Sequence, residues 1–268
     1  MPASTSPRRG VEGIRRPARR WPWVLVGLIV MIPAAVVLLP ASMIGRFLPA
    51  QVHAEDFSGS FLHGAAGKII VNARDAGAIE WQIHPLSLLR LAAVADIHWV
   101  KVAFVIDGTV ELSPHGAAAH DVHGGGPIDN LRDLGLASGW RGSAALSFAD
   151  VKTDFTTLQS IRGRIEANEL SSDRIAEGGE LGSYILQLGE AAVAPDGSVT
   201  GTLSDAGGPL EVQAQIRFSP GTRTGVFSGT LKERPEASPA LRNQINSLAQ
   251  LKVRDAAGRF PVELEFTF

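Results

Sequence analysis

The stretch LEVQAQIRF, residues 210–218, decides the fold class, because apolar and polar side chains alternate along it without a break. Successive side chains of a β-strand point to opposite faces of the sheet, so this pattern predicts a strand with one apolar and one polar face. The stretch VELEFTF at 262–268 repeats the alternation. Together the two runs predict a mainly β fold for the C-terminal half of the chain.

The same pattern extends toward the N-terminus. IEWQI at 79–83 alternates, and it follows the run KIIVNA at 68–73 and the turn Asp75-Ala76-Gly77, which predicts a hairpin. Turn sequences at 195–197, 206–209, 219–221 and 256–258 separate strands of about six to ten residues, as in an antiparallel meander. One-faced strands must bury their apolar side, and a sandwich, a half-pipe and an open roll all satisfy this requirement.

Only three stretches have helical character, at 85–91, 128–136 and 238–251. In the third, Ser238 can cap the first turn and Pro239 suits the first helical position. Leu241, Ile245, Leu248 and Leu251 fall on one face of that helix. We therefore expect a short helix near the C-terminus, docked against the sheet.

A transmembrane helix is predicted at 21–45, where WPWVLVGLIVMIPAAVVLLPASMIG contains no charged residue. At about 1.5 Å per residue this run can cross a hydrocarbon core of about 30 Å. Six arginines precede it and only Arg46 follows directly, so the N-terminus is expected in the cytoplasm and the rest on the far side. The alternative is a signal peptide cleaved after Val52-His53-Ala54, but the apolar run is long for a signal peptide and ends too early.

These patterns divide the chain into a basic tail at 1–20, the transmembrane helix at 21–45, a linker at 46–55 and a β-rich domain at 56–268. A division of that domain into two lobes near 115–127 stays open. Beyond residue 20 the chain is acidic, because six of its 25 basic residues and one of its 27 acidic residues lie in the tail. This charge argues against nucleic acid as a partner, and the absence of cysteine excludes thiolate chemistry and disulfides.

The strongest candidate for chemistry is HGAAAHDVHGGG at 115–126, where His115, His120 and His123 lie near Asp121. Imidazole and carboxylate are zinc ligands. No cysteine or helical His pair supports such a site, so we favour a solvated glycine-rich turn. A nucleophile elbow is also missing, which disfavours a periplasmic hydrolase. We expect no catalytic residue, no metal and no cofactor.

The exported part resembles the family of type II secretion system protein N, a bitopic inner-membrane component of Gram-negative bacteria. The matching segments occur in the family's order: GSFLHG at 59–64, WQIHPLSLL at 81–89, GPL at 208–210, SPG at 219–221, GTL at 229–231 with Arg234, and GRF at 258–260. Leu62 departs from the pattern, since the family usually has tryptophan there. The resemblance implies a non-enzymatic accessory protein, facing the periplasm and contacting inner-membrane platform proteins or the outer-membrane secretin.

Seven residues are candidates for protein contacts: Trp81, Pro85, Leu88, Leu89, Val262, Leu264 and Phe266. Trp81 is more simply interpreted as a core residue, although aromatic side chains also anchor interfaces. The strand at 262–268 could accept a partner strand if it lies at a free edge. The rival function is a periplasmic lipid-handling protein, in which the one-faced strands form an apolar groove for acyl chains.

Overall fold

A computed structural model describes residues 38–46, 48–134, 139–173, 179–249 and 254–267 of the chain. Two compact units are distinguished, Met1–Leu38 and Leu39–Phe268, and the second contains the sheet. None of the helices within the described ranges has the length and apolar character needed to cross a membrane. Residues 21–37 of the predicted transmembrane helix lie outside these ranges.

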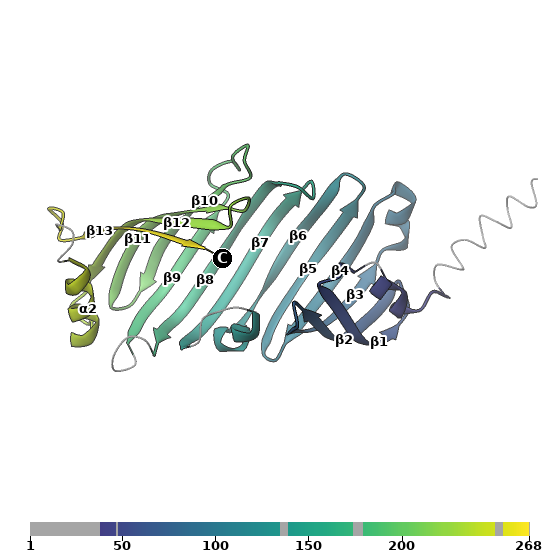
Figure 1. Ribbon diagram of the computed structural model, residues 1–268, viewed down its shortest axis with the longest axis horizontal. Coiled ribbons are helices and arrows are strands. Elements are labelled where there is room, and N and C mark those ends of the chain that lie inside the picture. The colour runs from purple at the N-terminus through teal and green to yellow at the C-terminus, as the bar shows by residue number, and fades with distance from the viewer. Residues whose placement is uncertain (1–37, 47, 135–138, 174–178, 250–253, 268) are drawn as a thin grey trace, which may run out of the picture. The chain divides into compact units, whose positions relative to one another are not determined.

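The second unit is built on one 13-stranded sheet, in which each strand pairs with its neighbours in the chain (Figure 1). All pairings are antiparallel, and β1 and β13 form the two edges. The strands are β1 (Val52–Gly59), β2 (His63–Val71), β3 (Arg74–Ile83), β4 (Ala93–Lys101), β5 (Phe104–Ser113), β6 (Gly116–Pro127), β7 (Trp140–Thr153), β8 (Leu158–Ser172), β9 (Glu180–Leu188), β10 (Val199–Gly207), β11 (Leu210–Ser219), β12 (Thr224–Glu233) and β13 (Phe260–Thr267). The helical elements are η1 (Ala41–Arg46), η2 (Pro85–Arg90), η3 (Ile128–Leu134) and α2 (Pro239–Ala249).

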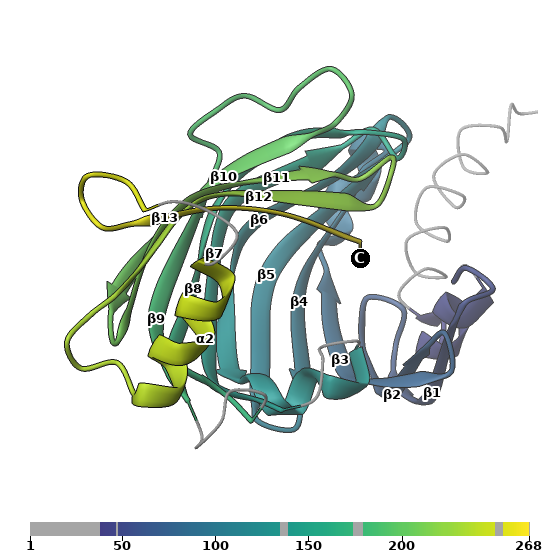
Figure 2. The same ribbon diagram turned by 60° about the vertical axis from the view of Figure 1, so that its left-hand side comes forward.

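The sheet is open and curved, and α2 lies on its concave side (Figure 2). The predicted antiparallel meander is confirmed, and of the architectures left open by the sequence, a half-pipe agrees with a single curved sheet. The alternation at 210–218 has the predicted effect, because Leu210, Val212 and Ala214 of β11 are buried on the concave side.

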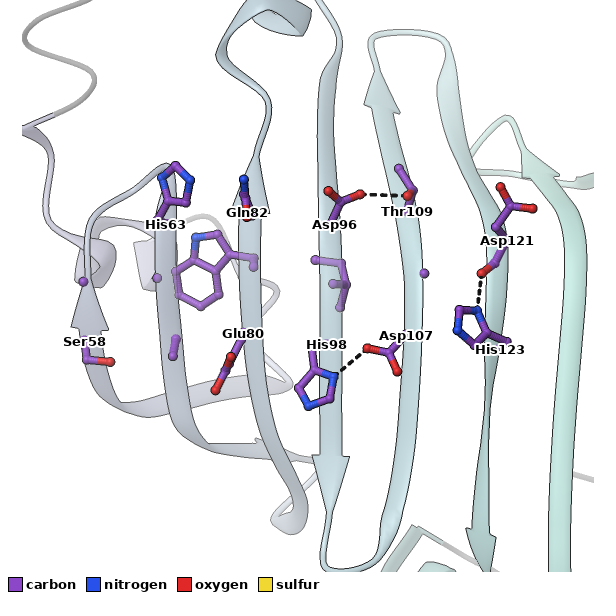
Figure 3. A pocket seen from close by; sticks show the side chains of 16 residues that line it. Ser58, His63, Glu80, Gln82, Asp96, His98, Asp107, Thr109, Asp121 and His123 are labelled. Carbon is purple, nitrogen blue, oxygen red and sulfur yellow. Dashed lines mark hydrogen bonds and ion pairs between the residues drawn. The ribbon is translucent and has the colours of Figure 1, made fainter.

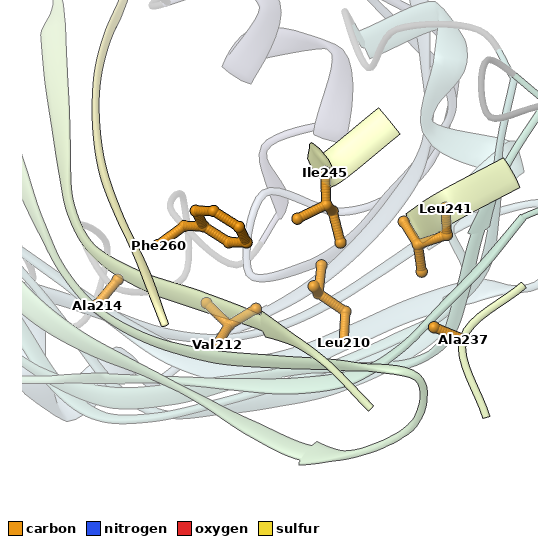
Figure 4. Packing of buried hydrophobic residues seen from close by; sticks show 7 residues of the cluster. All are labelled: Leu210, Val212, Ala214, Ala237, Leu241, Ile245 and Phe260. Carbon is orange, nitrogen blue, oxygen red and sulfur yellow. The ribbon is translucent and has the colours of Figure 1, made fainter. Parts of the chain in front are cut away.

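The main apolar cluster lies between β11 and α2 (Figure 4). Leu241 and Ile245 of α2 are buried against β11, as predicted, whereas the side chains of Leu248 and Leu251 lie outside the described part. The backbone N–H of Leu241 donates to Ser238 Oγ at 3.2 Å, so the predicted cap is present. An isolated helix of this length is marginal in water, so packing on the sheet must hold α2 in place.

Two boundaries differ from the prediction. The glycine-rich stretch at 115–126 is not a turn, because residues from Gly116 onward form β6 in the middle of the sheet. A Cβ at Gly124 would meet the carbonyl oxygen of Val105 at 2.1 Å, so these glycines permit close strand packing. The predicted linker at 46–55 is shorter, because β1 begins at Val52.

Candidate functional site

An unbroken row of apolar residues and glycines crosses the concave face of the sheet. Directly opposed residues of paired strands share a face, so the register identifies the members of this row. The row, here called the apolar row, takes one residue from each strand in order: Phe57, Ala66, Ile79, Trp99, Ile106, Gly124, Leu146, Ile165, Leu186, Leu203, Ala214, Gly229 and Val262.

The apolar row is covered at one end and open in the middle. At β9–β12 it contributes to the cluster beneath α2. Across β6, β7 and β8 no described apolar side chain is buried, and Leu146 and Phe148 of β7 are only half-buried. The concave face of β4–β8, here called the trough, therefore presents apolar side chains without a described cover.

An apolar cavity of about 350 Å³ lies at the β1 side of the trough. Its lining is entirely apolar and includes Ile44 of η1, Trp81 of β3 and Ile97 of β4. Trp81 is 9% exposed, and its ring N–H donates to the carbonyl oxygen of Phe61 at 3.0 Å. The interpretation of Trp81 as a core residue agrees with this burial, although its side chain also lines the cavity.

The opposite face of the same strands carries a polar cavity of about 680 Å³ (Figure 3). His98 Nδ1 lies 2.6 Å from Asp107 Oδ1, and this hydrogen bond raises the pKa of His98. Asp96 contacts His84 Nε2 at 2.7 Å, and that bond lowers the pKa of the Asp96 carboxyl group. Both pairs are well exposed to solvent, so the electrostatic contribution of each is screened.

The polar cavity lacks the geometry of a hydrolytic site. A His–Asp pair can act as a general base only when a nucleophile lies within hydrogen-bond reach. Of the two hydroxyl side chains that line the cavity, Thr109 donates from Oγ1 to Asp96 Oδ1 at 2.8 Å, and Ser58 lies three strand spacings, about 14 Å, from His98. Within the described ranges, no group of three or more histidine or acidic side chains could hold a metal ion.

A second polar group lies on the concave side, beside α2. Arg234 donates from Nη2 to Asp205 Oδ2 at 2.5 Å and from Nη1 to the carbonyl oxygen of Gly208 at 2.8 Å. Burial raises the pKa of Tyr184, whose hydroxyl donates to the carbonyl oxygen of Leu181 at 2.5 Å. These bonds satisfy polar groups near the apolar cluster, so we assign them a structural role.

The predicted contact residues fall in separate places. Pro85, Leu88 and Leu89 lie in η2, between β3 and β4, where Leu89 is 81% exposed. Val262, Leu264 and Phe266 lie together on the concave side of the edge strand β13, where Leu264 is 58% exposed. The strand order separates the two groups, so they form distinct surfaces.

Some exposed or cavity-lining residues were missed by sequence reasoning. Leu86 and Leu91 are as exposed as Leu89 and extend the apolar surface around η2. Ile44 and Leu48 line the apolar cavity, although they lie in the segment assigned to the transmembrane helix and linker. The sequence shows that both residues are apolar, but it does not show that they line a cavity, because the cavity is formed with strands that are distant in the chain.

A sequence model described as "Type II secretion system (T2SS), protein N" matches residues 50–263, which include nearly the whole sheet. No curated protein and no solved structure matches the chain.

Proposed function

Because the chain belongs to the family of type II secretion system protein N, we propose that it is a non-enzymatic accessory component of that secretion machinery. In this proposal the apolar stretch that begins at Trp21 anchors the chain in the inner membrane and ends before η1, whose residues Ala41–Arg46 belong to the folded unit and not to the predicted helix at 21–45. The sheet then lies in the periplasm and works through contacts with platform proteins or the outer-membrane secretin. The observation that carries the proposal is the family match over residues 50–263.

The edge strand β13 is the surface best suited to a partner. Among the described residues it pairs only with β12, so one row of its backbone N–H and C=O groups faces away from the sheet. Most of its residues are exposed, from Glu263 through Thr267. A partner strand added to this edge would gain main-chain hydrogen bonds and contacts with Leu264 and Phe266.

The apolar surface around η2 is a second candidate for a partner. Leu86, Leu89 and Leu91 are all more than three-quarters exposed and lie within one short segment. Exposed leucines gathered in this way favour contact with another protein. We propose that η2 and β13 contact different partners, because they lie on separate parts of the sheet.

Photo-cross-linking in cells tests this function. A benzophenone amino acid at Glu265 of β13 is expected to form adducts with a secretion-platform protein, and the same group at Ser147, exposed on the central strand β7, serves as the control. Loss of secretion in a strain lacking the gene is expected in parallel. Normal secretion in that strain, with no platform adduct from Glu265 of β13, would refute the proposal.

A further inference from the structure

The trough exposes apolar side chains that lie next to one another on the concave face, and such a surface favours the binding of an apolar ligand. Leu112 of β5 is 51% exposed, and Leu146 and Ile165 of the apolar row are half-buried. Continuous apolar surface in water is unfavourable in proportion to its area, and patches of this kind mark binding sites. At β9–β12 the same face is covered by α2, whereas no described element covers it at β4–β8.

The trough offers no hydrogen bonds to a ligand. Each of the strands β4–β8 is paired on both sides, so their backbone groups are used within the sheet. The one polar side-chain atom of the apolar row is Trp99 Nε1, and its N–H already donates to the carbonyl oxygen of Ala76 at 2.7 Å. A peptide in extended conformation would leave its own N–H and C=O groups unsatisfied on this surface, whereas a hydrocarbon chain has none to satisfy.

The dimensions favour a slender occupant. A two-turn helix about 10 Å across occupies roughly 850 Å³, so it does not fit in the apolar cavity of about 350 Å³ that adjoins the trough. The cavity volume lies in the range of small-ligand sites. Four strand spacings from β4 to β8 measure about 19 Å, and the acyl layer of one membrane leaflet is about 15 Å thick.

The position of the cavity in the chain indicates the source of such a ligand. Of the residues that line it, Ile44 lies at the end of the stretch predicted to cross the membrane and Leu48 lies three residues beyond that end. If the part of that stretch ahead of η1 is anchored, the few residues between it and Ile44 keep the cavity close to the membrane surface.

We infer that the trough and the apolar cavity bind one acyl chain of a membrane lipid. This inference rests on the sheet and goes beyond the proposed secretion role. Binding is driven by burial of the chain against the apolar row, so a charge in the middle of the row will oppose it.

Photo-labelling of the full chain in vesicles tests the inference. The vesicles contain phosphatidylethanolamine and phosphatidylglycerol, with either a diazirine-bearing phosphatidylethanolamine or diazirine-bearing palmitic acid as the probe. Mass spectrometry of the labelled peptides is expected to place adducts on β4–β8. Labelling of β4–β8 by the phospholipid supports a membrane lipid as the ligand. Labelling by palmitic acid alone would overturn that assignment and identify a free fatty acid as the ligand.

Two variants sharpen the test. Leu146→Glu places a charge in the apolar row at the half-buried position opposite Gly124 and is expected to reduce labelling by about tenfold or more. Ser147→Glu changes the next residue, which is exposed on the opposite face between His123 and Arg164, and is expected to label as the wild type does.

The position of the adducts on the wild-type chain tests the inference even if a variant fails to fold. Circular dichroism verifies that both variants retain their strands. Adducts confined to residues 21–45, or equal labelling of two folded variants, would overturn the inference. Neither result would bear on secretion, so the two proposals fail separately.

Discussion

Leu241→Ala tests whether α2 is held on the sheet by its apolar face. Leu241 is 3% exposed and packs in the cluster with Leu210 and Val212. Removing about three methyl or methylene groups loses roughly 2.4 kcal/mol of transfer free energy, and the cavity left behind raises the cost to about 3 kcal/mol. Because α2 is too short to persist alone, this loss should appear as detachment of the helix.

Hydrogen–deuterium exchange of the full chain in detergent micelles measures that detachment. A loss of about 3 kcal/mol lowers the protection of the α2 amides by roughly 100-fold. Asn243→Ala is the matched control, since Asn243 lies on the exposed side of the same helix. Equal protection in Leu241→Ala and Asn243→Ala would refute the claim that the apolar face holds α2.

Two further predictions concern the polar face and a turn. The bond from Asp107 raises the pKa of His98 above its ordinary value of 6.5, so the pair stabilises the fold below that pH and the contribution is lost as the pH rises through the folded-state pKa. In NMR titrations Asp107→Asn is expected to lower the pKa of His98, and Asp121→Asn, which changes the same cavity, to leave it in place; the reverse order would contradict this assignment. Val102 is 78% exposed and has a φ of 58°, a conformation that costs a β-branched residue about 1–2 kcal/mol. Val102→Gly is therefore expected to raise the melting temperature, and a lower one would show that the valine is not strained.

The sequence predicted the strands best where large apolar residues alternate with polar ones, as in β11 and β13. It failed at β6, because alanine and glycine carry too little apolar contrast to show an alternation. The helix α2 was predictable from local signals, since Ser238 and Pro239 mark its start. These successes all depend on interactions between residues near one another in the chain.

The trough was not predictable for a physical reason. Alternation shows that a strand has an apolar face, but it does not show what covers that face. Whether Leu146 is buried depends on the register of five successive strands and on where α2 docks. The sequence therefore allowed lipid binding as a rival function, but only the order and register of the strands show which residues would contact the lipid.

The topology of the chain in the membrane is the premise of the proposed function, and cysteine labelling tests it most directly. The natural chain has no cysteine, so single substitutions can be labelled without background. With a membrane-impermeant maleimide on intact spheroplasts, Ser147→Cys in β7 is expected to react at once, and Ser4→Cys in the basic tail only after lysis. Reaction of Ser4→Cys in intact spheroplasts, with Ser147→Cys protected until lysis, would contradict the account.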